Sequence, residues 1–122
     1  MIARTWHGAV REPDADRYLD YLEETGVKAC RETPGNLGVQ VLRRVRDGRA
    51  EFVFTSFWES MDAVRAFAGA DVERAVYYPE DARWLLEMEP GVRHYEVVSG
   101  AEIVVNRVAD RNSLPGGGKT SG

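Results

Sequence analysis

Two apolar segments of similar length meet at Asp47-Gly48, and this arrangement predicts a β-hairpin in the middle of the chain. The first segment, 37–45, carries valines at odd positions, whereas the second, 51–58, is apolar or aromatic at both odd and even positions. An Asp-Gly pair between such segments favours a tight turn, because both residues tolerate a positive φ. A strand that is apolar on both faces requires cover on both. We therefore expect helices on one face of the sheet and a second copy of the chain on the other.

The segments that flank the hairpin alternate between strand and helix patterns. Residues 2–10 have the β-branched and aromatic composition of a strand, and the apolar spacing becomes helical over 15–31. Ser60 is the expected N-cap of the next helix, and 92–98 has the pattern of a final strand. The order β-α-β-β-α-β predicts an α+β fold of ferredoxin-like topology, with a four-stranded antiparallel sheet and helices on one face.

The region between Ser60 and the last strand predicts shorter elements. A helical piece is expected over 72–77, and Pro79 both ends it and suits the first turn of another short helix. The pattern fades after the last strand, and the end of the chain is rich in glycine and serine. We expect one domain over 1–99 and a largely flexible C-terminal extension over 100–122.

The charge balance and the cysteine count exclude several classes of function. The net charge is −4 and the pI is near 5.2, whereas nucleic acids and anionic membrane surfaces attract a basic face. No apolar run reaches the ~18 residues of a membrane helix. Cys30 is the only cysteine, so an internal disulfide and a CxxC zinc motif are both excluded. These features favour a cytoplasmic protein in which Cys30 is a small buried side chain.

Four short motifs resemble one known family. They are Trp6-His7-Gly8, Trp58-Glu59-Ser60-Met61, Tyr77-Tyr78-Pro79-Glu80-Asp81 and His94-Tyr95-Glu96-Val97. Together they resemble the antibiotic biosynthesis monooxygenase-like family over residues 1–98. The resemblance implies a homodimeric α+β barrel, in which two sheets pack face to face and each sheet forms a pocket with its own helices. The family includes cofactor-free oxygenases of aromatic polyketides, haem-degrading oxygenases, isomerase-like members and proteins of unknown activity.

His7 is the expected catalytic base. It shares a strand face with Ala3 and Thr5, whose small side chains leave room for a cavity. A neutral imidazole there is suited to remove a phenolic or activated C–H proton near neutral pH. The alternative is a structural histidine bonded to a carboxylate or a backbone carbonyl. The resemblance adds that family members place an asparagine on an early strand of the pocket, where His7 is the comparable residue here.

Further side chains are expected to complete the pocket. Tyr77 and Tyr78 lie before a proline and offer hydroxyl groups to a substrate oxygen, so they join His7 as catalytic candidates. The expected substrate-binding residues supply small, flat or imidazole surfaces, and they are Thr5, Trp58, Trp84 and His94. Glu80 and Asp81 are expected to cap the helix after Pro79, and a second role as a base stays open for them. Two histidines without a third ligand do not predict a metal site.

Three functions remain open at this point. The first is a cofactor-independent monooxygenase that takes a proton from an aromatic or enolisable small molecule. The second is haem binding with or without haem degradation, with His7 or His94 as the axial ligand. The third is a dimer that binds a small molecule without catalysis. The fold is common to all three and does not choose among them.

Overall fold

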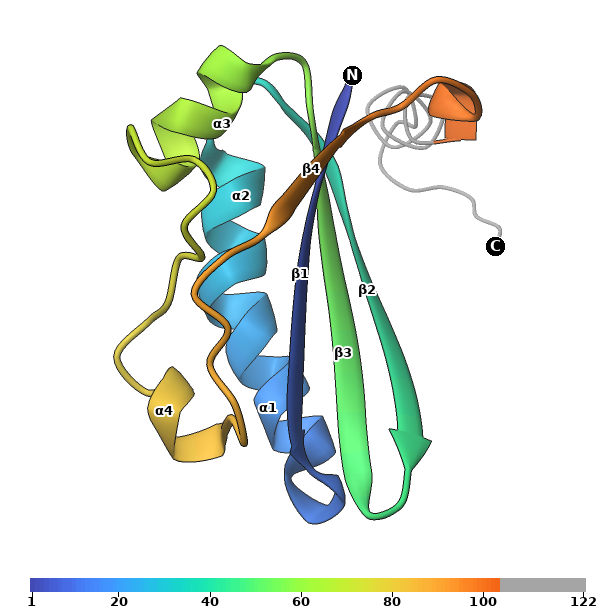
Figure 1. Ribbon diagram of the computed structural model, residues 1–122, viewed down its shortest axis with the longest axis vertical. Helices are drawn as coiled ribbons and strands as arrows, with labels where there is room; N and C mark the ends of the chain where they lie inside the picture. Colours follow the sequence, from blue (N-terminus) through green and yellow to red (C-terminus); the bar gives the residue numbers. More distant parts are fainter. Residues whose placement is uncertain (104–122) are drawn as a thin grey trace, which may run out of the picture.

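A computed structural model describes residues 1–103 of the chain (Figure 1). The expected flexible extension lies, from residue 104 onward, outside the described residues. The elements follow the expected order, and their bounds are β1 Ile2–Arg11, η1 Glu12–Asp14, α1 Ala15–Leu22, η2 Glu23–Val27, α2 Lys28–Glu32, β2 Asn36–Arg46, β3 Arg49–Trp58, α3 Met61–Ala68, α4 Asp81–Trp84 and β4 Arg93–Glu96. None of the helices in residues 1–103 is long and apolar enough to cross a membrane.

The four strands form one antiparallel sheet with the spatial order β2-β3-β1-β4. This order confirms the predicted ferredoxin-like topology. The β2–β3 hairpin turns at Asp47 and Gly48, whose φ angles are 55° and 76°, as a tight turn with two left-handed residues requires. Strand β4 pairs with the first half of β1, so that Arg4 lies opposite His94.

The helices cover one face of the sheet (Figure 1). The helical segment 12–32 is continuous, but its middle, η2, widens into a π-helical turn. Tyr18 of α1 packs edge-on against Phe52 of β3 with ring centroids 5.5 Å apart. Further along, Trp58 stacks on Phe67 of α3 at 5.6 Å. Ser60 caps α3 as expected, since its hydroxyl accepts a hydrogen bond of 3.2 Å from the Ala63 amide.

Residues 69–80, here called the connecting segment, join α3 to α4 without forming the helix expected over 72–77. That prediction is wrong because the backbone of the segment bonds to distant residues. The Ala75 amide donates to the Pro90 carbonyl at 2.8 Å, and the Val92 amide donates to the Glu73 carbonyl at 2.9 Å. These bonds hold the connecting segment in an extended path beside the chain that leads into β4, as Figure 1 shows.

The other face of the sheet, here called the outer face, carries no helix among α1 to α4 (Figure 1). It presents apolar side chains, including Leu42 of β2 and Tyr95 of β4, which are 51% and 52% exposed. Val53 and Phe57 of β3 share this face and are only partly buried. A helix-covered face and an apolar uncovered face are the arrangement expected for β3, which is apolar on both sides.

Candidate active site

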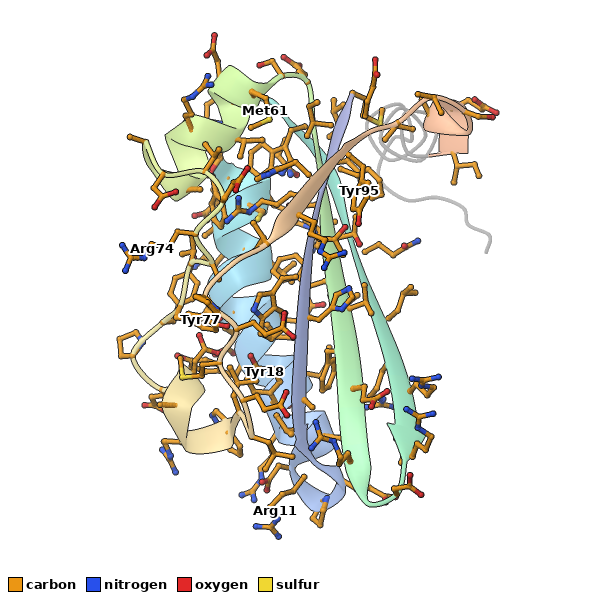
Figure 2. The ribbon with its side chains drawn as sticks, in the orientation of Figure 1. Arg11, Tyr18, Met61, Arg74, Tyr77 and Tyr95 are labelled. Atoms are coloured by element: carbon orange, nitrogen blue, oxygen red, sulfur yellow. The ribbon has the colours of Figure 1, made fainter. Side chains whose placement is uncertain are left out.

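A cavity of about 40 Å³ lies between the helix-covered face of the sheet and the connecting segment. This volume is room for about three water-sized molecules. Figure 2 shows Tyr18 of α1 and Tyr77 of the connecting segment on the helix side of β1. The walls are largely aromatic and are supplied by Trp6, Tyr18, Phe54, Phe67, Tyr77 and Tyr78.

The cavity contains both of the fully buried charged residues in the described part of the chain. Arg4 of β1 is 5% exposed and Asp81 of α4 is 4% exposed. Within residues 1–103 neither is part of an ion pair, with each other or with any other side chain. Buried charges are normally paired, so two unpaired ones at a single cavity indicate a site that binds a ligand.

Asp81 is held by neutral donors from two elements. Its Oδ1 accepts a 2.8 Å hydrogen bond from the Tyr18 hydroxyl, and its Oδ2 accepts a 2.7 Å bond from the Tyr78 amide. Burial, and then the neighbouring Asp81 carboxylate, raise the pKa of Tyr18 above its usual value. Tyr18 therefore stays protonated and remains a donor. Each carboxylate oxygen retains a second lone pair for another proton or donor.

Arg4 ties β1 to the connecting segment and to β4. Its guanidinium donates through Nη1 to the Val72 carbonyl at 2.5 Å and through Nη2 to the Arg74 carbonyl at 3.0 Å. Nη1 also lies 3.0 Å from Nε2 of His94. Because a guanidinium has only donors, Nε2 of His94 must be the acceptor and therefore unprotonated. Burial, and then the Arg4 charge, lower the pKa of His94 in agreement with this role.

Tyr77 and Tyr78 both line the cavity, as expected, but their hydroxyl groups differ. The Tyr77 hydroxyl accepts a 3.1 Å bond from Nε1 of Trp6 and donates to the Glu89 carbonyl at 2.5 Å. The Tyr78 hydroxyl has no hydrogen-bond partner within residues 1–103. Burial raises the pKa of both phenols, so both are neutral near pH 7. Tyr78 is therefore the better donor to a ligand.

Cys30 and Ser56 close the cavity toward the second half of the core. Cys30 is 1% exposed, which confirms the predicted burial, and this burial raises the pKa of its thiol to about 12. The Ser56 hydroxyl accepts a 2.8 Å bond from Nε1 of Trp58. A protonated thiol does not act as a nucleophile at neutral pH, and the Ser56 oxygen already accepts the hydrogen bond from Trp58. These two residues form part of the wall.

The structure places His7 and Thr5 outside the cavity. Side chains alternate along β1, and the inward positions are those of Arg4 and Trp6. His7 is exposed on the outer face, opposite Val53 of β3. The expected position of His7 in the pocket between sheet and helices is therefore wrong. The small neighbours that suggested it lie on a face that the described helices leave open.

The other residues predicted to bind substrate, Trp58, Trp84 and His94, do not line the cavity. Trp58 is fully buried in the core around Val64 and does not line the cavity. Trp84 is held between Arg17 and Arg83, whose guanidinium carbons lie 5.5 and 5.4 Å from its ring centre. His94 touches the cavity only through Arg4. His7 and His94 lie on opposite faces of the sheet and share no pocket.

The cavity residues do not fit the haem alternative. An axial ligand has to be a neutral imidazole, a thiolate or a similar donor. His94 already accepts from Arg4, His7 lies on the outer face, and the Cys30 thiol stays protonated. A volume of about 40 Å³ is also far below the several hundred Å³ of a cofactor pocket. No three His, Cys, Asp or Glu side chains of residues 1–103 gather closely enough to hold a metal ion.

The sequence did contain signals for the two charged residues. Arg4 lies between Ile2 and Trp6 on the buried parity of β1, and a charged residue at such a position calls for a functional reason. Asp81 is predicted to cap a helix, with a second role as a base left open, and it is the first residue of α4. Its burial depends on Tyr18, which lies 63 residues away and which the helical pattern of α1 marked only as core.

Solved structures of similar fold come from three bacteria. A protein described as an antibiotic biosynthesis monooxygenase, from Nitrosomonas europaea, matches with a TM-score of 0.55 at 15% identity, over 80% of this chain and 99% of that one. A protein of the same description from Bacillus cereus matches with a TM-score of 0.55 at 20% identity, over 81% of this chain and 94% of that one. The haem degrader MhuD from Mycobacterium tuberculosis, solved with two haems in its active site, matches with 0.52 at 24%, over 82% and 98%. No curated protein sequence matches.

The fold and the cavity define a small α+β protein whose single sheet encloses a site against its own helices. The model of the antibiotic biosynthesis monooxygenase family matches residues 1–77, which include β1 to α3 and most of the connecting segment. The chain therefore belongs to the antibiotic biosynthesis monooxygenase family. The three solved structures reported above are below 25% identity and support the fold alone.

Proposed function

We propose that this chain is a cofactor-independent monooxygenase that removes a proton from an aromatic or enolisable small molecule. The observation that carries the proposal is the buried Asp81 carboxylate at an aromatic cavity, which within residues 1–103 accepts hydrogen bonds only from the Tyr18 hydroxyl and the Tyr78 amide. A carboxylate with a free lone pair in a site shielded from water is suited to act as a general base. Family membership supports this class of chemistry.

The proposed reaction balances without a metal or flavin. A substrate CH₂ group transfers one proton to Asp81, and the electron pair left on carbon reduces O₂. One oxygen atom becomes the carbonyl oxygen of the product, and the other leaves as water with the two hydrogens of the CH₂ group. Tyr78 lines the cavity, and in the proposed reaction its hydroxyl donates to the substrate oxygen on which negative charge develops.

Admission of an aromatic substrate requires the cavity to widen. The connecting segment forms one wall and is irregular, and its side chains Val76, Tyr77 and Tyr78 face the cavity. Most of its backbone bonds run to neighbouring residues or to 90–92 rather than to the sheet. Segments with few regular backbone bonds are the ones that open at low cost. We propose that this segment moves to admit the substrate.

Oxygen uptake tests the function directly. Purified protein is supplied with phenols and anthrones in an oxygen electrode, and the wild type is compared with Asp81→Asn. The variant keeps the shape of the side chain but accepts no proton, so the rate should fall by about 100-fold or more. His7→Ala is the control, because His7 lies outside the cavity.

Three outcomes would contradict the proposal. They are wild-type activity in folded Asp81→Asn, loss of activity in folded His7→Ala, and no substrate-dependent uptake with any compound of the panel. The last outcome would favour the binding protein without catalysis. Circular dichroism on each variant separates a loss of the fold from a loss of the base.

A hemin titration tests the haem alternative. We expect a weak change in the Soret band that is unaltered in His7→Ala and His94→Ala, because no histidine of residues 1–103 lines the cavity. A saturable shift at one haem per subunit that one histidine variant abolishes would establish haem binding instead. It would also show that the cavity opens far beyond its present volume.

We further propose that the chain is a homodimer in which two outer faces pack together. The partly exposed Leu42, Val53 and Tyr95 side chains supply an apolar surface for this contact. A two-fold dimer presents the same patch from both subunits, so β3 of one copy would lie near β3 of the other. The expected cytoplasmic location stays a prediction.

A further inference from the structure

Arg4 carries a buried positive charge that no carboxylate of residues 1–103 neutralises. Its side chain is 5% exposed, and it belongs to none of the ion pairs in this part of the chain. Burial lowers the pKa of the guanidinium, which reports the cost of removing this charge from water. Such a cost is normally offset by an anion nearby.

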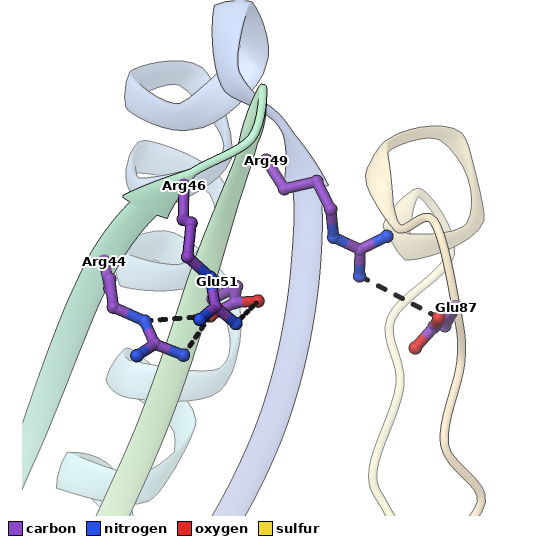
Figure 3. Close-up of polar contacts among 5 residues, drawn as sticks. All are labelled: Arg44, Arg46, Arg49, Glu51 and Glu87. Carbon is purple, nitrogen blue, oxygen red and sulfur yellow. Dashed lines mark hydrogen bonds and ion pairs between the residues drawn. The ribbon is translucent and has the colours of Figure 1, made fainter.

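The arginines at the hairpin end of the sheet show the usual arrangement (Figure 3). Arg44 bonds Glu51 through Nη2 at 2.7 Å and through Nε at 3.1 Å, and Arg46 lies 3.6 Å from the same carboxylate. Arg49 lies 3.8 Å from Glu87. These exposed cations have acidic partners although water would solvate them, whereas the buried Arg4 has none.

The hydrogen bonds of Arg4 leave part of its guanidinium unused. Nη1 donates to Val72 and lies in hydrogen-bond distance of His94, and Nη2 donates once, to Arg74. A guanidinium has five N–H donors, so Nε–H and one Nη2–H have no protein partner within residues 1–103. Free N–H groups of a guanidinium form charge-assisted hydrogen bonds with the oxygens of a carboxylate or with a single anionic oxygen. Arg4 lines the cavity, where a ligand can reach these donors.

The surroundings of Arg4 favour an aromatic ligand with one negative group. The guanidinium carbon lies 5.8 Å from the ring centre of Phe67, and Trp6 is the next inward residue of β1. Asp81 lies at the same cavity and repels anions, so the favourable position for an anionic group in this cavity is beside Arg4. A bound anion would then leave the neutral part of the ligand for Asp81.

We propose that Arg4 selects ligands whose aromatic ring bears an anionic oxygen, either a carboxylate or a phenolate. The anion binds the free donors of Arg4, and the ring lies between the aromatic walls. This inference rests on the proposed function only in taking the cavity as the substrate site. It adds the charge of the substrate and a residue that determines specificity, and neither depends on whether O₂ is consumed.

Calorimetric titrations with matched ligands test the inference in the wild-type protein. Benzoate and benzamide have the same shape and differ in charge. Nitrobenzene is the neutral partner of 4-nitrophenolate, from which it differs only by the phenolate oxygen. We expect one anion to bind about tenfold or more tightly than its neutral partner, as a charge-assisted hydrogen bond in a buried site provides. The preferred pair distinguishes a carboxylate from a phenolate. Equal affinities within both pairs, or no binding of either anion, would overturn the proposal.

Three variants connect the preference to Arg4. Arg4→Gln should abolish the preference for the anion, and Arg4→Lys should retain part of it because the charge remains. Arg65→Gln removes the same charge from the exposed face of α3, where Arg65 pairs with Asp62, and should bind like the wild type. A folded Arg4→Gln that still prefers the anion would refute the role of Arg4. If Arg4→Gln does not fold, the wild-type ligand pairs and Arg4→Lys decide the question.

The Asp81→Asn variant separates this inference from the proposed function. Binding is measured without turnover, so the variant should keep the preference for the anion, or increase it because a repelling charge is gone. Anion preference without oxygen uptake would mean that the monooxygenase proposal fails while this inference holds. Oxygen uptake without anion preference would mean the reverse.

Discussion

The contact between Arg4 and His94 couples the protonation state of His94 to the charged group at the cavity wall. His94 accepts a hydrogen bond through Nε2, which is possible only for the neutral ring. Protonation would place two positive charges side by side at the cavity wall. Because Arg4 also binds two carbonyls of the connecting segment, the charge on His94 bears on how this segment is held.

We expect the free energy of unfolding to fall as the pH drops below 6.5 because of His94. Its folded-state pKa lies below the ordinary value of 6.5, so its contribution is fully present above pH 6.5 and is lost as the pH falls through the folded pKa. His94→Gln should reduce this pH dependence in urea unfolding. The difference in slope between the wild type and His94→Gln isolates the contribution of this residue.

The opposite result would be informative about Arg4. If His94→Gln unfolds with the same pH dependence as the wild type, then His94 accepts no hydrogen bond from Arg4 in solution. The donors of Arg4 would then be free to a greater extent than the structure indicates.

At the scale of elements, strand β1 contributes to the site through two of its inward residues, Trp6 and Gly8, which pack against each other. The six-membered ring of Trp6 lies across Gly8, so that a Cβ at Gly8 would collide with it. Nε1 of Trp6 in turn donates to the Tyr77 hydroxyl at 3.1 Å. The absence of a side chain at Gly8 therefore allows the indole to lie flat along the strand and to hold the connecting segment.

Gly8→Ala should destabilise the protein by about 1–3 kcal/mol, the usual cost of overpacking. The indole has to move, and its bond to Tyr77 is lost. Trp6→Phe removes the part of the ring that collides, so the double variant should be less unstable than the sum of the two single changes. Urea unfolding measures the cycle. Additive effects would show that Trp6 does not cover Gly8.

The elements themselves were predictable wherever their signals are local. The Asp47-Gly48 turn, the Ser60 cap and the change from strand to helix spacing at Ala15 each act within a few residues, and all three were correctly placed. The connecting segment was not, because its path depends on bonds to residues 90–92 and to Arg4. The same limit applies to the site.

For the site, the sequence identified the cavity tyrosines but not Arg4, and it predicted Asp81 as a helix cap with a second role as a base left open. Tyr77 and Tyr78 were found because a proline follows them and holds them in a turn. The prediction that His7 faces the cavity is wrong, because the inward side of β1 is the one that carries Arg4 and Trp6, and the small neighbours of His7 lie on the outer face. The partnership of Asp81 with Tyr18 joins residues far apart in the chain, and no local pattern reveals it.

At the scale of the whole molecule, the outer face is the largest feature that the helices leave uncovered (Figure 1). Val53 lies at its centre, paired across the sheet with His7 of β1 and Leu42 of β2. A dimer through this face would bury all three side chains. His7 would then lie at the interface and not at the cavity.

Val53→Lys should abolish the dimer and cause aggregation or unfolding, because it places an unpaired charge in the proposed interface. Gel filtration with light scattering measures the mass in solution. Ala66→Lys is the control, since it adds the same charge to an exposed position of α3 and should leave the dimer intact. A wild-type protein with the mass of a monomer, or a Val53→Lys variant that keeps the mass of a dimer, would refute the dimer through this face.

The π-helical turn η2 acts as a spacer of one residue. A π turn contains an extra residue compared with a regular helix, and each residue of an α-helix rotates its neighbours by about 100°. Gly26 in this turn packs directly against the Phe54 ring, and Cys30 follows one turn later among the residues that line the cavity. Removal of one residue from 23–27 would restore a regular helix and rotate α2 away from the sheet. An alignment with a relative that lacks the turn therefore requires a one-residue gap there, and without it every later wall residue is matched to the wrong partner.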